Sequence, residues 1–341
     1  MTRELVSRVA ARATTRIGHD TRSDEAERAP APHAQRMTGR PGPHRRRRRL
    51  TLRQRRQALF IVLVMPAVGL RLITAAYPLG QTIYRSLTNL DLIQGTNSLV
   101  GVSNYAAMTH DPVVRTAVNF TLIFVIVSTV LQLALGLLIA LFLNARFRGR
   151  GVARALNLLP WAIPTIVAAF AFRWMLDDQF GLITTDVLQP LGYAGAPLTT
   201  RTGARASMIA VNVWKNTPFV AAILLAGLQT IPRDLHDAAR VDGANAWQRT
   251  RYVTIPLLVP TLVTTGLFFL IWQLGSFDLV YGLTFGGPGS ATEVLALTIF
   301  RQGLLFFDFG YAAAIAVVLI GLVALLSVVG VALFRRYEVS T

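Results

Sequence analysis

The sequence contains no cysteine, a single lysine and few charged residues, which make up 15% of its 341 positions. Without cysteine, the chain cannot form disulfide bonds, thiolate nucleophiles or zinc–thiolate sites. A phosphate-binding loop of the P-loop type needs a lysine after glycine, whereas Lys215 follows Trp214. The five histidines form no metal-binding pattern, and three of them lie within the first 56 residues. We therefore expect this chain to bind no cofactor or metal and to have no ATPase activity of its own.

Apolar residues make up 53% of the sequence and gather in long runs that carry almost no charge. A helix needs about 20 apolar residues to cross the roughly 30 Å hydrocarbon core of a bilayer. The runs have about this length, and they do not alternate polar and apolar faces as a soluble core helix would. We predict an all-α, polytopic integral membrane protein with six transmembrane helices. The predicted spans cover about residues 58–83, 117–143, 156–176, 207–230, 254–276 and 310–334.

Residues 1–56 differ in composition from the rest, with 16 arginines, five acidic residues and few large apolar side chains. Such a segment cannot bury enough apolar surface to fold, so we predict a disordered tail before a membrane domain at 57–341. Its basic run Arg45–Arg49 lies just before the first apolar segment. A nucleic-acid-binding tail is the alternative, but this position is typical of a cytoplasmic segment beside anionic lipid head groups. We expect membrane lipids, and no nucleic acid, as its partners.

The distribution of arginine between the predicted spans predicts their orientation. The tail, the connections after the second and fourth spans and the end of the chain hold 26 arginines, and the opposite connections hold five. This bias predicts that both termini and the loop at 231–255 are cytoplasmic. The outer side would then include Gly286–Gly289, where Pro288 lacks an amide donor, so we interpret this segment as a turn and not a phosphate-binding loop.

The loop at 231–255 has the pattern of a short helix, a glycine turn and the start of a second helix. Pro232 favours a helix start, and two aspartates that follow it complement the positive end of the helix dipole. Ala238 and Ala239 would leave a flat face that another protein can approach closely. Gly243 permits the left-handed conformation that ends such a helix, and Pro256 would open the fifth span.

This loop resembles the "EAA" coupling loop of the permease subunits of binding-protein-dependent ABC importers, especially the carbohydrate-uptake (maltose/glycerol-phosphate type) subfamily. The Asp-Ala-Ala at 237–239, the Asp-Gly-Ala at 242–244 and the proline twelve residues further on have the family's spacing. Asp237 replaces the usual glutamate, Thr250 an aromatic residue, and Ile255 a leucine. Further blocks resemble the family in the same order along the chain: Tyr77–Pro78, Ser86–Leu87, Val100–Tyr105, Trp214–Phe219, Ala226–Gln229 and Phe277–Pro288.

The resemblance implies the type I ABC importer permease fold, alternating access and a place in the bacterial plasma membrane as a multi-pass protein. The implied partners are a second homologous permease, two ATPase subunits that use ATP and magnesium, and an extracytoplasmic solute-binding lipoprotein. Each coupling loop would dock into a groove of one ATPase, where Asp237 would contact a basic residue and the alanines would pack. The residues that this likeness assigns to ATPase coupling are Asp237, Ala238, Ala239, Asp242, Gly243, Ala244 and Pro256.

Lys215 is the most unusual residue inside a predicted span, because ionisable groups there are costly and often functional. Together with the nearby Asn212 and Asn216 it is a candidate for the solute path. The alternative is that Lys215 braces the helix bundle.

A second candidate set for the solute path lies on the fifth span. Sugars are usually held by aromatic faces and by amide hydrogen bonds, and Phe268, Trp272 and Gln273 offer both kinds of group. Phe268 and Trp272 share one helix face at i, i+4. Aromatic packing between helices is the alternative reading of these residues.

We expect the chain to import a sugar or oligosaccharide as part of a heterodimer, with glycerol phosphate or a polyol as the alternative solute. A phosphate solute would favour a basic cavity, for which only Lys215 is available inside the spans. An ion-coupled carrier or channel that works without an ATPase would need acidic residues at mid-membrane. The predicted spans contain no Asp, Glu or His, which also disfavours a membrane-embedded enzyme.

Overall fold

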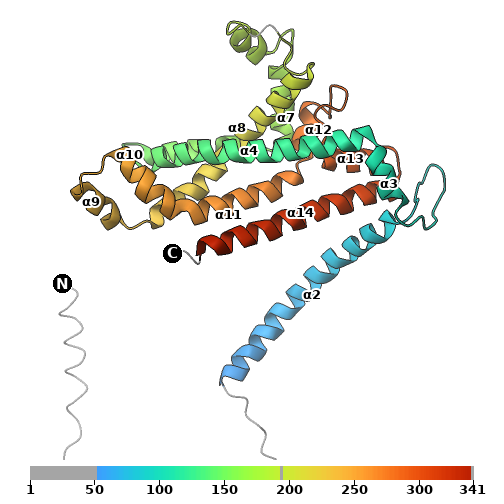
Figure 1. Ribbon diagram of the computed structural model, residues 1–341, viewed down its shortest axis with the longest axis horizontal. Helices are drawn as coiled ribbons and strands as arrows, with labels where there is room; N and C mark the ends of the chain where they lie inside the picture. Colours follow the sequence, from blue (N-terminus) through green and yellow to red (C-terminus); the bar gives the residue numbers. More distant parts are fainter. Residues whose placement is uncertain (1–51, 193–194, 339–341) are drawn as a thin grey trace, which may run out of the picture. The chain divides into compact units, whose positions relative to one another are not determined.

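The computed structural model describes residues 52–192 and 195–338, and nearly all of its ordered backbone is helical (Figure 1). The chain divides into two units between Leu63 and Val64, within α2, and the unit that begins at Val64 holds every element that follows α2. After α2 (Leu52–Ser86), the elements are α3 (Ser103–His110), α4 (Pro112–Asn144), α5 (Arg150–Asn157), α6 (Leu159–Ala162), α7 (Thr165–Met175), the π-helical turn η1 (Thr184–Leu188), α8 (Arg201–Thr230), α9 (Arg233–Val241), α10 (Ala246–Arg249), η2 (Thr250–Thr254), α11 (Ile255–Leu274), α12 (Asp278–Leu283), α13 (Leu295–Phe300), η3 (Arg301–Leu305) and α14 (Phe309–Glu338).

Among the described residues, five helices are long and apolar enough to cross a membrane. The helices α5–α6 and α7 make a sixth span if this bent pair is counted as one. The prediction of an all-α membrane protein with six spans is confirmed. The five continuous spans are Leu59–Ser86, Pro112–Asn144, Arg201–Thr230, Ala246–Leu274 and Phe309–Ala332.

The start of α2 differs from the predicted end of the tail. The helix begins at Leu52, so Arg53, Arg55 and Arg56, which the prediction placed in the tail at 1–56, are helical. Arginine is a good helix former, so the α2 helix extends into the basic segment beyond the span that begins at Leu59. The remainder of the predicted tail, residues 1–51, lies outside the described residues.

Two spans begin earlier than their apolar runs because a side chain caps each helix. The carboxylate of Asp111 accepts hydrogen bonds from the amides of Val113 and Val114, with Pro112 at the first helical position of α4. The Thr200 hydroxyl accepts from the amide of Gly203 at the start of α8. Such caps satisfy amide donors that have no partner within the helix.

The third span, predicted at about 156–176, is broken. The axes of α5–α6 and α7 differ by 85°. At the break, Ile163 and Pro164 have extended backbone conformations with ψ near 133° and 134°. A residue before proline is pushed out of the helical region, and proline itself offers no amide donor, so Pro164 ends the first helix.

Pro256 lies in the first turn of α11, where the sequence placed it, but the candidate fifth span begins earlier, at Ala246. Helix α10 passes through the π-helical turn η2 into α11, and Thr254 and Ile255 keep helical dihedral angles. A proline in the first turn of a helix is tolerated, because the amide donor that it lacks would have no carbonyl partner within that helix. The loop at 231–255 is therefore joined to α11 by continuous helix.

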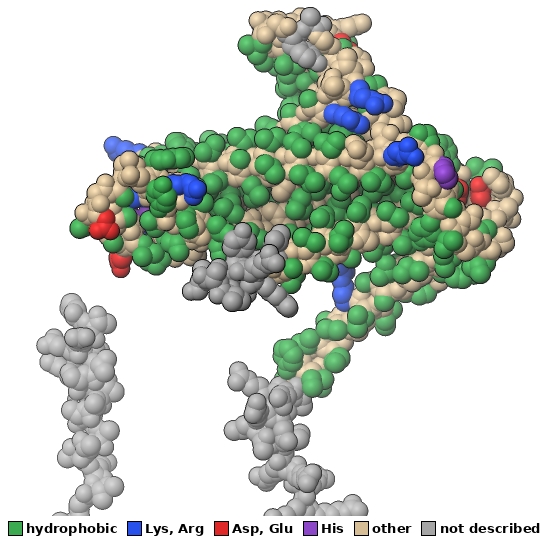
Figure 2. Space-filling view, viewed as in Figure 1, with side chains coloured by type: hydrophobic (Ala, Val, Ile, Leu, Met, Phe, Trp, Pro, Cys, Tyr) green, Lys and Arg blue, Asp and Glu red, His purple; other side chains and the backbone are tan. Residues whose placement is uncertain are grey.

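The core lies where α4 packs against α8 and where α11 contacts α4, α8 and α14. Figure 1 shows α4, α11 and α14 running beside one another, and hydrophobic side chains cover much of this face in Figure 2. A Cβ atom at Gly136 of α4 would lie only 2.6 Å from a methyl carbon of Val220 on α8. Glycine at this place allows the two backbones to approach closely, as is common between membrane helices.

Candidate functional site

The loop between α8 and α11 forms the helix–turn–helix that its sequence predicts. Helix α9 follows Pro232, whose backbone is extended, and Asp234 lies in its first turn. Gly243 has φ +80° and its amide donates to the carbonyl of Arg240 at 3.0 Å. The left-handed glycine ends α9, as expected for a helix C-terminus.

The second helix of this loop begins with a cap that the sequence interpretation missed. The Asn245 side chain accepts from the amide of Gln248 at 2.9 Å, and the Gln248 side chain accepts from the amide of Asn245 at 2.8 Å. This reciprocal pair is a capping box, and the spacing of an N-cap residue and a glutamine three positions later was its signal. It holds the turn after Gly243 in one conformation.

The assigned coupling residues lie on an open surface. Asp237 and Arg240 form an ion pair at 3.0 Å and both side chains are 63% exposed, so the pair contributes little to stability. Ala238 and Asp242 are exposed, while Ala239 and Ala244 are half-buried. Several large apolar side chains of the loop also face outward, which is typical of a contact surface. They are Leu235, Val241, Trp247 and Tyr252, with Val241 89% exposed.

A buried amide network joins α4, α8 and α11 in the middle of the bundle. Asn212 donates to the side chain of Gln273, which donates in turn to the Thr129 hydroxyl at 2.8 Å and to the Gln132 side chain at 3.2 Å. Asn216 donates to Asn212 at 2.8 Å. Buried polar groups need such partners where water is absent. The structure therefore places Asn212 and Gln273 in helix contacts.

Lys215 contacts the break in the third span. Its side chain is buried, and Nζ lies 3.2 Å from the carbonyl oxygen of Pro160, 2.9 Å from that of Trp161 and 2.5 Å from that of Ile163. The break leaves these carbonyls without helical donors, and an ammonium group has three donors to offer. Of the two readings of Lys215, this geometry matches the brace. The sequence signal for its partners was the pair of prolines in the third span.

Phe268 and Trp272 lie together on α11, with ring centroids 5.7 Å apart, and they are 45% and 63% exposed. Gln273, the third member of that predicted set, is 1% exposed and points into the amide network. The structure therefore brings the two rings together and separates Gln273 from them, because neighbouring residues of a helix face different directions.

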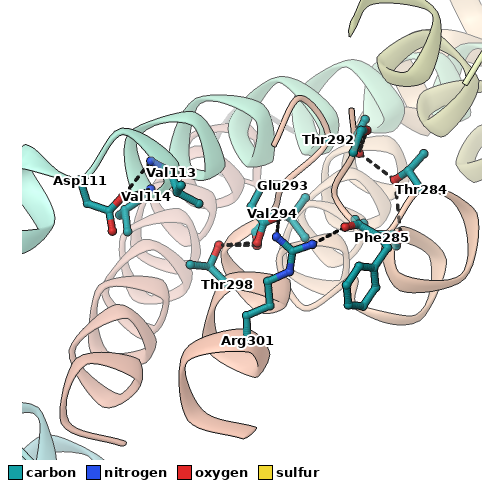
Figure 3. Close-up of polar contacts among 12 residues, drawn as sticks. Asp111, Val113, Val114, Thr284, Phe285, Thr292, Glu293, Val294, Thr298 and Arg301 are labelled. Atoms are coloured by element: carbon teal, nitrogen blue, oxygen red, sulfur yellow. Dashed lines mark hydrogen bonds and ion pairs between the residues drawn. The ribbon is translucent and has the colours of Figure 1, made fainter. Parts of the chain in front are cut away.

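A second polar cluster, which the sequence interpretation missed, joins the turn at 284–294 to α13 and η3 (Figure 3). The buried carboxylate of Glu293 lies 3.0 Å from Nη1 of Arg301 and accepts from the Thr298 hydroxyl at 3.1 Å. Arg301 also donates to the carbonyl of Phe285, with its guanidinium 4.6 Å from the centroid of the Phe285 ring. Burial raises the pKa of Glu293, and the Arg301 charge and the Thr298 hydrogen bond oppose this shift.

Gly286 is the residue that permits this cluster. Its φ is +82°, and a Cβ atom would lie 2.2 Å from a carboxylate oxygen of Glu293. Any larger residue would displace the carboxylate. The expected turn at Gly286–Gly289 is confirmed, and it encloses an ion pair that sequence spacing alone does not reveal.

Comparison with known proteins decides the family. Residues 132–339 match the family described as the inner membrane component of binding-protein-dependent transport systems. The chain belongs to this family. The resemblance inferred from the loop at 231–255 is therefore confirmed, and the family match spans α8, the loop and α11.

Relatives in this family align with most of the chain. A probable ABC transporter permease of Sinorhizobium fredii is 36% identical over 274 residues, which are 80% of this chain and 87% of that protein. A trehalose/maltose transport system permease of Thermococcus litoralis is 35% identical over 291 residues, 84% of this chain and 97% of that protein. A sulfoquinovosyl glycerol transport system permease of Agrobacterium fabrum is 36% identical over 266 residues, 77% of this chain and 86% of that protein.

The fold agrees with these relatives. A solved bacterial ABC transporter for import of the acidic polysaccharide alginate aligns with a TM-score of 0.71 at 22% identity, over 83% of this chain and 96% of that chain. The chain is thus a permease subunit of an ABC importer and a multi-pass inner-membrane protein. It is a transport subunit that works with a binding protein and other transporter subunits, and ATP hydrolysis resides in a separate ATPase.

Proposed function

We propose that this permease moves a sugar or oligosaccharide into the cytoplasm by alternating access, after an extracytoplasmic binding protein delivers it. Relatives named for trehalose/maltose and for sulfoquinovosyl glycerol transport, 35% and 36% identical, support a carbohydrate-type solute. Glycerol phosphate is a weaker candidate, because the only lysine of the spans already donates to three backbone carbonyls.

The observation that carries this proposal is the exposed α9–Gly243–α10 hairpin and its helical connection to α11. An ATPase that binds the exposed Leu235, Val241 and Trp247 pulls directly on α11 through η2, because no flexible loop intervenes. Asp237 then exchanges its exposed contact with Arg240 for a basic residue of the ATPase, and the two alanines before Arg240 pack in the groove.

The proposed assembly contains this chain, a second homologous permease, two ATPase subunits and a solute-binding lipoprotein. ATP and magnesium bind to the ATPases, and this chain takes no cofactor. Both termini and the loop at 231–255 face the cytoplasm, which the excess of arginine on that side supports.

The proposed solute path runs past α11 and α8. The exposed rings of Phe268 and Trp272 offer a stacking surface for a sugar, and the half-buried Asn216 lies at the edge of the amide network. The residues behind this surface support it and do not contact the solute: the Asn212–Gln273 hydrogen bond joins α8 to α11, and Lys215 holds the broken third span.

The test is ATP-dependent uptake of radiolabelled maltose and trehalose by the complex reconstituted in liposomes, with and without the ATPase subunits. Gly243→Val should lower uptake and solute-stimulated ATP hydrolysis several-fold, because a β-branched residue does not tolerate φ +80° and the hairpin would change shape. Gly149→Val is the matched control, because Gly149 has φ +86° and open space around it but lies outside the hairpin. Uptake by the permease without ATPase, or equal loss in both variants, would contradict the proposal.

A further inference from the structure

A hollow of about 520 Å³ separates the hairpin from the ends of α4 and α8. Arginines from three different elements line it, namely Arg146 after α4, Arg233 and Arg240 on α9, and Arg249 on α10. Asp237 is the single acidic residue in the lining. Charged side chains gather at this end of the molecule in Figure 2.

The positive charges of this hollow are mostly uncompensated. Asp237 pairs with Arg240, and Arg249 donates to the backbone carbonyl of Ala244 at 2.7 Å, which leaves its charge in place. Among the described residues, Arg146 and Arg233 form no ion pair. Four guanidinium groups around one hollow with a single carboxylate repel one another, and a bound anion would reduce that repulsion.

The lining fits a phosphate group better than a small carboxylate. Guanidinium forks bind phosphate oxygens in pairs, and arginines on separate elements can approach several oxygens at once. The wall nearest the spans includes two leucines, Leu141 from the last turn of α4 and Leu228 from the last turn of α8, beside the polar Asn144. Apolar side chains beside arginines at the end of a membrane helix match the boundary between lipid tails and head groups.

We propose that this hollow binds a phosphate group, carried by an anionic phospholipid head group or by a free phosphate compound. The bound phosphate would connect α9 to the ends of α4 and α10. The inference rests on the proposed cytoplasmic orientation only for its choice of leaflet, since binding itself is measured without transport.

The first test measures bound phosphate on the full-length chain after detergent delipidation. One arm adds phosphatidylglycerol or phosphatidylcholine and counts bound lipids by native mass spectrometry, and the other adds radiolabelled inorganic phosphate in equilibrium dialysis. The double variant Arg146→Gln/Arg233→Gln should lose affinity about tenfold or more, because each charge-assisted contact contributes substantially to binding. The control Arg148→Gln/Arg251→Gln removes equal charge from exposed positions outside the hollow and should change affinity less than about twofold.

The results distinguish a phospholipid from a free phosphate compound as the bound molecule, and a specific site from a general effect of positive charge. Binding of phosphatidylglycerol alone assigns the site to a lipid, and binding of inorganic phosphate assigns it to a free phosphate compound. Equal losses in the two double variants would overturn the proposal, as would no binding to the unmodified chain. Release of the bound phosphate when the ATPase subunits are added would also overturn it, because a carboxylate of the ATPase would then be the natural occupant.

Discussion

At the scale of single residues, Lys215 shows how a charge is kept inside a membrane helix. Lys215 is 4% exposed, and its Nζ donates to three carbonyl oxygens of the broken third span. Methionine in its place is unbranched and nearly as long, but it has no donor, so those carbonyls would lose their hydrogen bonds.

We expect Lys215→Met to lower the free energy of unfolding by about 3 kcal/mol, as for other buried polar groups that lose a partner. The measurement is thermal unfolding of the purified chain in detergent, with the folded fraction at each temperature determined by size-exclusion chromatography. Thr264→Val, which removes an exposed hydroxyl from α11, is the control and should change little. If Lys215→Met is as stable as the control, the ammonium does not brace the break.

Trp272 and Gln273 form a natural pair for comparison, because they are adjacent on α11 and differ in burial, at 63% and 1% exposed. Gln273→Leu removes the centre of the amide network and should destabilise the bundle by about 1–2 kcal/mol, measured by thermal unfolding. Trp272→Leu should leave stability unchanged and reduce sugar uptake, since its ring faces away from the core. Normal uptake in Trp272→Leu would remove this ring from the solute path.

At the scale of elements, the pair of Glu293 and Arg301 connects the turn at 284–294 to α13 and η3. Burial raises the pKa of Glu293 above its ordinary value of 4.5, so the folded state holds the proton more tightly than the unfolded chain. The contribution of protonated Glu293 to the stability of the folded state is therefore fully present below about pH 4.5. It is lost as the pH rises through the pKa of Glu293 in the folded state.

Glu293→Gln keeps the shape of the side chain and cannot titrate. We therefore expect the melting temperature of the unmodified chain, relative to this variant, to fall as the pH rises from 4.5 towards neutrality. Thermal unfolding over this pH range measures the difference. Arg301→Gln removes the opposing positive charge and should move the fall to higher pH. Parallel curves for the unmodified chain and Glu293→Gln would refute this prediction.

At the scale of the whole molecule, the absence of cysteine permits single-cysteine labelling of each side of the membrane. We expect a membrane-impermeant maleimide to label Asn97→Cys from outside intact cells and Arg148→Cys only after the cells are opened. Both positions are exposed, in connections on opposite sides of the predicted α4 span. Labelling with the reverse pattern would invert the orientation proposed from the arginine distribution.

The chemistry of neighbouring residues was enough to predict several features of this protein. Apolar runs long enough to cross a bilayer predicted the spans, because hydrocarbon thickness sets a length that composition reveals directly. Pro232, Gly243 and their neighbours predicted the α9–α10 hairpin, since caps and left-handed turns depend on a few adjacent residues. These local rules also carried the resemblance to the importer permeases.

Tertiary structure alone decided which polar groups meet between different spans. The carbonyls that hold Lys215 lie more than 50 positions away along the chain, and Gln273 joins Thr129 across 144 positions. The sequence analysis grouped Gln273 with the aromatic residues of α11 by the chemistry of its side chain, yet its side chain is buried in contacts with α4. Such pairings depend on how helices cross and where a span breaks, and the energy of a buried polar group depends on partners that no local pattern specifies.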